Sequence, residues 1–207
     1  MEISRRLLSA FVKGMECYSP SDRSALWSSM ASLYHQDLLA VLKRGDVKGL
    51  ASELAALFQG SVVQGMFIRG GVQDSRRQAQ LSIQTLDTLV AVAEYLALVP
   101  LDNPEQGKIG AAFDEGLDSL VERVEQALGS RIGMPSVGSP WGVDIAGRMA
   151  APRTLRHHYT SRRVQDTLGA IDHRAVDKPQ NIVEIGAGFG GVARNLMNSQ
   201  ALLVENY

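Results

Sequence analysis

The sequence has few cysteines, and this shortage excludes two kinds of site. Cys17 is the only cysteine in 207 residues, so an internal disulfide and a cysteine-cluster metal site are both excluded. Such cysteine usage is typical of a reducing compartment, and we expect Cys17 to be a half-buried small apolar side chain. Because 45% of the residues are hydrophobic, the chain can still bury a core, and we expect a folded globular protein.

An excess of one charge sign is also lacking. The net charge is −1, from 21 basic and 22 acidic side chains, and the two signs interleave along the whole sequence. No basic field is present that would attract nucleic acid or an anionic membrane. We therefore expect neither nucleic acid nor a membrane among the partners.

Long hydrophobic runs are missing as well. The most apolar window, LVAVAEYLALVPL, is interrupted by Glu94 and stopped by Pro100, which makes it too short to span a bilayer. The first residues, MEISRRLLSAFVKGMECY, carry an acid at Glu2 and no sustained apolar run, so they are not typical of a secretion signal. The sequence predicts a cytoplasmic protein.

Residues 1–130 have the spacing of an α-helical domain. Apolar residues recur every three or four positions over 21–42, which predicts one amphipathic helix. Asp46 is placed to cap a second helix, and a long helix is predicted over 75–99. A further helix ends at Gly129. We expect these helices to form an antiparallel bundle whose apolar stripes make a core.

The sequence changes character over 131–178, where prolines and glycines exclude a long helix at first. We expect a junction here, with GVDIAGRMA forming a small hairpin that turns near Ala146 and Gly147. Pro152 can then serve as the first residue of a helix that ends at Gly169.

The last segment, 179–207, contains the motif NIVEIGAGFGGVARNL. Ile182, Val183 and Ile185 are β-branched and come just before glycines, which predicts a buried parallel strand that ends in a turn. The residues GVARNLM then predict a helix, and ALLVENY predicts the start of a second strand.

Three glycines of this motif, Gly186, Gly188 and Gly191, have the spacing G-x-G-x-x-G. Missing side chains at this spacing allow a tight turn, close approach of a ligand and close helix packing. Glu184, two positions before the first glycine, is more discriminating, because dinucleotide-binding strands usually carry an apolar or small residue there. Its carboxylate can pair with the ammonium group of S-adenosylmethionine, directly or through water.

With this acid and glycine run, VEIGAGFG resembles the first motif of class I S-adenosylmethionine-dependent methyltransferases. The longer order SPWGVDIAGRMAAPRTLRHHYTSRRV, a polar link and IVEIGAGFGGVARNL is similar to the sugar O-methyltransferase family over about 138–196. The resemblance implies an enzyme that uses S-adenosylmethionine to methylate a saccharide or another small-molecule hydroxyl. It also implies a set of cofactor-binding residues: Glu184, Gly186, Ala187, Gly188 and Gly190.

Together, the apolar spacing and the resemblance predict a mostly α chain with three parts. A helical bundle over 1–130 and a junction over 131–178 would precede the first β-α unit, over 179–207, of an incomplete Rossmann-like domain. Since each strand-helix-strand unit takes about 30 residues, we expect the chain to be the N-terminal portion of a longer protein and to be inactive alone. The acid that binds the ribose would lie near Glu205 or beyond the chain, and this assignment stays open.

Two alternatives remain beside the methyltransferase. The chain could be a non-catalytic helical module that binds a partner or forms a homo-oligomer. An incomplete sheet leaves a strand edge with unpaired backbone groups, which can pair with another chain. It could also be part of an NAD-dependent oxidoreductase, since the glycine spacing is shared with that class.

The helix that precedes the motif supplies no assigned catalytic residue. His157 and His158 are adjacent and point about 100° apart on a helix, so they cannot easily share one ion. No H-E-x-x-H pattern is present, so we predict packing or surface roles for both and no metal site. Trp141 is a weaker candidate for lining a site. Basic and aromatic side chains of the same helix are weaker candidates for contacts with a carboxylate or a sugar hydroxyl: Arg156, Tyr159, Arg162 and Arg163.

Overall fold

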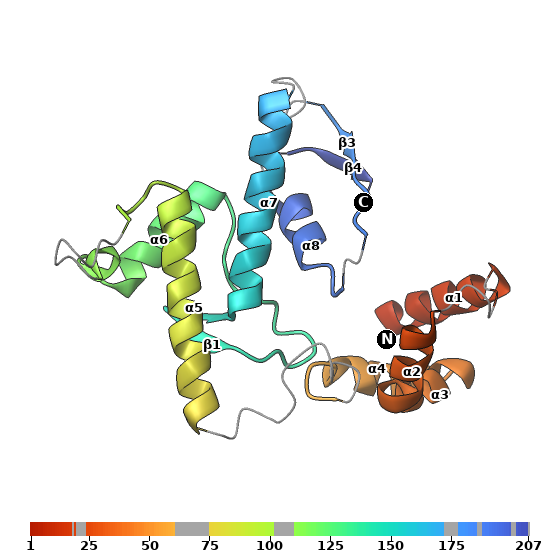
Figure 1. The fold of residues 1–207 in the computed structure, drawn as a ribbon. Helices are drawn as coiled ribbons and strands as arrows, with labels where there is room; N and C mark the ends of the chain where they lie inside the picture. The colour runs from red at the N-terminus through yellow and green to blue at the C-terminus, as the bar shows by residue number, and fades with distance from the viewer. Residues whose placement is uncertain are drawn as a thin grey trace. The chain divides into compact units, whose positions relative to one another are not determined.

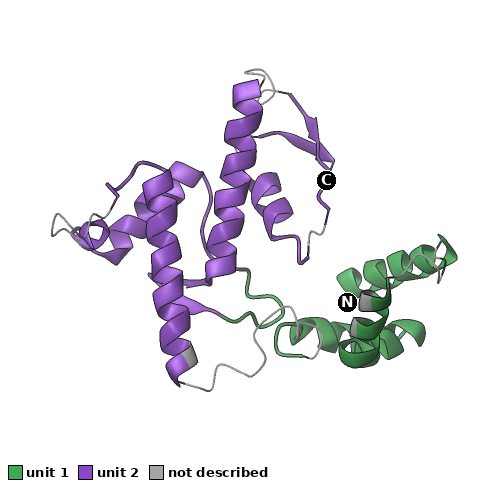
Figure 2. Cartoon of the chain, in the orientation of Figure 1, with its two compact units in different colours: residues 1–73, 135–141 green, residues 74–134, 142–207 purple. Residues whose placement is uncertain are grey.

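The computed structural model describes residues 1–17, 19, 24–60, 75–101, 110–171, 178–185, 188–199 and 202–206. The chain divides into two compact units, shown in different colours in Figure 2. The first unit contains Met1–Gln73 and Pro135–Trp141, and the second contains Asp74–Met134 and Gly142–Tyr207. The described part of the chain is mostly α-helical.

The described part of the first unit contains four helices, and three of them share a small core. Leu8, Val41 and Leu50 are buried together at its centre. The helices are α1 (Glu2–Cys17), α2 (Ala25–Tyr34), α3 (Gln36–Lys43) and α4 (Val47–Ala55) (Figure 1). The three that share the core are α1, α3 and α4. The sequence did not predict α1, and Cys17 at its end is exposed, contrary to the half-buried position we expected.

The single helix predicted over 21–42 is instead two helices, α2 and α3, with a break at His35, where ψ is 10°. Side chains near the break compete for the carbonyl groups at the end of α2. The Ser32 hydroxyl donates to the Ser29 carbonyl oxygen at 2.9 Å, and the Gln36 amide donates to the Ser32 carbonyl oxygen. Such bonds offer the backbone an alternative to a continuous helix.

The start of α4 agrees with the sequence. Asp46 lies just before the helix in an extended conformation, and its side chain accepts a hydrogen bond from the Gly49 amide at 2.8 Å. The predicted cap is therefore confirmed.

The second unit has a larger core that joins residues distant in the sequence. Leu89 and Ala93 of α5, Val121 of α6 and Leu155 of α7 are all completely buried within it. Its first part contains α5 (Ser75–Tyr95), η4 (Ala111–Phe113), α6 (Leu117–Leu128), β1 (Val143–Ile145), β2 (Arg148–Ala150) and α7 (Pro152–Ile171). This division differs from the predicted boundaries at 130 and 178, because α5 and α6 share one core with α7.

The hairpin of β1 and β2 forms where the sequence predicted it. The strands pair antiparallel with Ile145 opposite Arg148, and the two turn residues, Ala146 and Gly147, have φ values of 51° and 72°. Positive φ at both central residues is the geometry that matches the twist of a two-residue hairpin.

An ion pair fixes this hairpin to α6. The Arg148 guanidinium lies 2.7 Å from the Glu125 carboxylate, and these side chains are only 20% and 13% exposed. The Ile132 amide also donates to Glu125, at 3.0 Å. Burial opposes ionisation of Glu125, but the hydrogen bonds from Arg148 and Ile132 outweigh it and lower the pKa of this carboxyl.

The end of the chain forms a small parallel unit of strand, helix and strand. Gln180 lies opposite Val204, and Asn181 opposite Asn206. The elements are β3 (Gln180–Asn181), α8 (Gly191–Asn198) and β4 (Val204–Asn206). The helix and the second strand appear where the sequence predicted them.

The first strand of this unit differs from the prediction. Ile182, Val183 and Ile185 were expected to form a buried strand, but β3 comes earlier, and Val183 and Ile185 are 89% and 97% exposed. Among the described residues only β4 pairs with β3, so the expected burial is wrong for this chain by itself. No helix in the described ranges combines the length and hydropathy that crossing a bilayer requires.

Candidate functional site

The glycine turn lies between β3 and the start of α8. Gly188 and Gly190 have φ values of 58° and 68°, and Gly190 is the residue that caps α8. Residues with a side chain rarely adopt this left-handed conformation, so the turn favours glycine at both positions. Gly186 and Ala187, also predicted to bind the cofactor, lie outside the described residues.

The third glycine of the motif, Gly191, brings α8 against α7. A Cβ atom at Gly191 would lie 1.9 Å from Nδ1 of His157 and 2.4 Å from its Cε1. Only a residue without a side chain allows this approach. Gly191 therefore has the helix-packing role that the glycine spacing predicted, and its contact on α7 is His157.

Further contacts show that α7 and α8 run side by side in the same direction (Figure 1). The Ser161 hydroxyl donates toward the Val192 carbonyl oxygen at 3.3 Å. One turn later on α7, the Gln165 amide donates to the Ser199 hydroxyl at 2.7 Å. Because the contact residues ascend together in both helices, the glycine turn lies beside the first half of α7.

Charged groups from two elements act on His157 at this place. The ring is half-buried, and its pKa is lowered mainly by burial and then by the charge of Arg153, four residues earlier on the same side of α7. Glu184, which is half-buried in the segment before the turn, opposes these effects and raises the pKa of His157. The lowered pKa leaves the imidazole neutral at pH 7.

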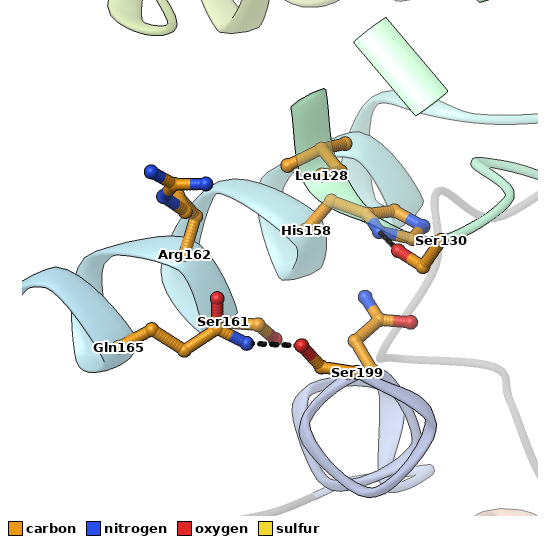
Figure 3. A pocket seen from close by; sticks show the side chains of 8 residues that line it. Leu128, Ser130, His158, Ser161, Arg162, Gln165 and Ser199 are labelled. Carbon is orange, nitrogen blue, oxygen red and sulfur yellow. Dashed lines mark hydrogen bonds between the residues drawn. The ribbon is translucent and has the colours of Figure 1, made fainter. Parts of the chain in front are cut away.

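His158, the next residue, points into a different environment. It is 2% exposed and lines a cavity of about 10 Å³ between α7, α8 and the residues after α6, which Figure 3 shows with its lining side chains. Its Nδ1 lies 3.4 Å from the Ser130 hydroxyl, and within the described chain Nε2 has no hydrogen-bond partner. Burial, followed by the charges of Arg194 and His157, lowers the pKa of His158 to about 4.

This cavity is not a cofactor site. A space of about 10 Å³ admits about one water molecule. The other lining residues are mostly polar and come from both helices: Ser161, Gln165, Asn195 and Ser199. His158 is thus a packing residue of the α7–α8 interface.

The basic and aromatic residues of α7 contact other parts of the second unit. Arg162 forms an ion pair with Asp166 at 2.8 Å, and the same carboxylate accepts a hydrogen bond from the Tyr95 hydroxyl at 2.7 Å. The Tyr95 and Tyr159 rings meet edge to face with centroids 4.8 Å apart, and the Arg163 guanidinium lies 5.9 Å from the Tyr95 ring centre. These side chains join α5 to α7 and do not gather at the glycine turn.

The remaining candidate residues are Arg156, Glu205 and Trp141. Arg156 is exposed on α7, and Glu205 is exposed on β4. Trp141 belongs to the first unit, where its indole nitrogen donates to the Phe58 carbonyl oxygen at 2.6 Å. Among the described residues, no group of three His, Cys, Asp or Glu side chains is arranged to hold a metal ion.

The turn thus combines two left-handed glycines, Gly188 and Gly190, with a carboxylate at Glu184 and an imidazole at His157. The sequence pointed to Glu184 and the glycines but not to His157. The contact between His157 and Gly191 joins two separate helices, and no sequence motif fixes the number of residues between them. The Glu184 carboxylate can bind a cation, and the neutral imidazole can exchange a proton or a hydrogen bond. No protein-family model, curated protein or solved structure matches the chain.

Proposed function

We propose that this chain carries the S-adenosylmethionine site of an O-methyltransferase that acts on a sugar hydroxyl. The observation that carries the proposal is the order of elements at the end of the chain. A parallel strand, a turn with left-handed Gly188 and Gly190, helix α8 and a second parallel strand follow one another, and Glu184 stands directly before the turn. This order is that of the first nucleotide-binding unit of a Rossmann-like domain.

Each part of the turn has a role in this function. The glycines let the backbone lie against the cofactor, and the Glu184 carboxylate pairs with the ammonium group of its methionine part. The cofactor supplies a methyl group activated by a sulfonium charge. The protein's contribution is mainly to align the acceptor oxygen behind that methyl group, so much of the rate gain is positional.

The exposed β-branched side chains near the turn are consistent with this proposal. Val183 and Ile185 are 89% and 97% exposed, whereas strands of a parallel sheet are normally buried on both faces. In the proposed domain, helices packed on the faces of a completed sheet would cover these side chains.

The test is calorimetric titration of the full product of the gene that encodes this chain. We expect S-adenosylhomocysteine to bind, and Glu184→Gln to weaken binding about tenfold, since one charge-assisted hydrogen bond is lost. Glu122→Gln, at an exposed position of α6, is the matched control and should leave the affinity unchanged. Binding of NAD in place of S-adenosylhomocysteine would favour the oxidoreductase and reject the methyltransferase.

A second function, a helical interaction module, is favoured by one feature of the first unit. Helix α1 exposes several large apolar side chains: Ile3 at 67%, Leu7 at 43%, Val12 at 54% and Met15 at 47%. Exposed apolar side chains that gather on one element can mark an interaction site. Light scattering coupled to size-exclusion chromatography tests self-association, and a monomer that persists at tens of micromolar would count against a homo-oligomer.

A further inference from the structure

We propose that Arg153 and His157 of α7 bind the carboxylate at the amino-acid end of the cofactor, while Glu184 binds its ammonium group. The inference rests on the proposed function, because it assigns one end of S-adenosylmethionine to particular side chains. It adds a helix that precedes the glycine motif to the site, with the α-amino-acid group as the chemical feature that is recognised.

The positions of the two helices place these side chains at the turn. His157 lies against Gly191, the first residue of α8, and α8 continues along α7 in the same direction. Arg153 is four residues earlier on the same side of α7, about 6 Å back along the helix axis at 1.5 Å per residue. Arg153 is therefore placed just beyond the beginning of α8, on the side from which the glycine turn arrives.

Charges of both signs meet at this position. The charge of Arg153 lowers the pKa of His157 and that of Glu184 raises it, so both act on the same imidazole. An α-amino acid carries an ammonium and a carboxylate on one carbon, and these charges complement Glu184 and Arg153. The nucleoside part of the cofactor carries neither charge, so it is not the part that these residues recognise.

The side-chain types also suit the two partners. Arginine presents planar N–H donors that match a carboxylate in a bidentate arrangement. His157 is half-buried and neutral at pH 7, so it can donate one ring N–H to a carboxylate oxygen without carrying a charge into the site. His158 cannot take this part, because it is 2% exposed and lines a cavity too small for a ligand.

Two ligands that differ only at the amino-acid end test the proposal. S-adenosylhomocysteine carries this end, and 5′-methylthioadenosine lacks it. We expect Arg153→Gln to weaken the binding of S-adenosylhomocysteine about tenfold and to change that of 5′-methylthioadenosine less than twofold. Arg153→Lys should restore most of the affinity. Arg163→Gln, which removes the same charge from the α5 side of α7, is the control and should change neither.

The ring of His157 gives a readout that needs no turnover. In NMR titrations of the free protein, Arg153→Gln should raise the pKa of His157 and Glu184→Gln should lower it. Saturating S-adenosylhomocysteine should raise this pKa, because its carboxylate favours the imidazolium, and 5′-methylthioadenosine should not.

The outcomes separate this proposal from the function on which it rests. If S-adenosylhomocysteine binds wild type and Arg153→Gln equally well, the carboxylate assignment is wrong and the methyltransferase proposal stands. If neither nucleoside binds the wild type, both proposals are rejected.

Discussion

Nδ1 of His157 stands 1.9 Å from the place where a Cβ atom at Gly191 would sit. With the imidazole in this position, only glycine fits at the third position of the motif. Gly191 at the end of the turn and His157 of α7 therefore depend on each other.

We expect Gly191→Ala to destabilise the protein, because the new methyl group would overlap the imidazole. The cost should be about 1–3 kcal/mol in the free energy of unfolding, the range for an overpacked contact, measured by urea denaturation. The double variant Gly191→Ala with His157→Ala should recover most of this loss. Gly14→Ala is the control, since nothing lies within 4 Å of its new methyl group; an equal loss there would contradict the explanation.

His158 should make the protein less stable in mild acid. Its pKa is lowered to about 4 by burial and neighbouring positive charges, against about 6.5 in the unfolded chain. Between these values the unfolded state binds more protons, so stability is complete above about pH 6.5 and is lost as the pH falls towards 4. We expect a loss of about 2 kcal/mol from pH 7.5 to pH 5.

Urea denaturation at pH 7.5 and pH 5 measures the decrease in the free energy of unfolding that we assign to His158. Replacing this side chain by leucine removes the titrating group, so His158→Leu should show a smaller decrease than the wild type. An unchanged decrease would assign the acid sensitivity to other groups.

The ion pair between Arg148 and Glu125 should contribute more than the surface pairs of the same protein. Arg148→Met leaves the largely buried Glu125 carboxylate without its cationic partner, and we expect a cost of about 2–3 kcal/mol, measured by denaturant unfolding. The control is Arg5→Met, since Arg5 and Glu2 are 64% and 76% exposed and such pairs contribute less than about 1 kcal/mol. Similar costs for the two variants would argue against this difference.

The cap at Asp46 gives a prediction for the first unit. Asp46→Ala removes the acceptor of the Gly49 amide and should cost about 1 kcal/mol, whereas Asp46→Asn should cost less because its side-chain oxygen can accept the same bond. Thermal unfolding followed by circular dichroism measures both, and equal stability of all three proteins would show that the cap contributes nothing.

Local features were predictable because the residues that decide them are adjacent. The Ala146–Gly147 turn and the Asp46 cap each depend on a backbone conformation and a hydrogen bond that span four residues or fewer. The Gly129 helix end, with a φ of 64°, is of the same kind. Residues that are distant in the sequence have little effect on the conformation of such turns and caps.

One prediction that failed concerns burial. The apolar character of Val183 and Ile185 indicates that these residues can be buried, but burial requires another element packed against them, and the sequence of a strand does not identify that element. The break at His35 was missed because the apolar spacing continues through it. The helix is interrupted there by side chains that form hydrogen bonds with backbone carbonyl groups, which the apolar spacing does not reveal.

By itself the sequence determined the caps, the turns and the glycine motif with Glu184, since these follow from conformational preferences of short segments. Only the tertiary structure decided that α5 and α6 join α7, that Gly191 packs against His157 and that His158 is sealed in the interface. Those choices depend on which apolar faces bury each other, and many pairings satisfy the same sequence pattern until the whole core is assembled.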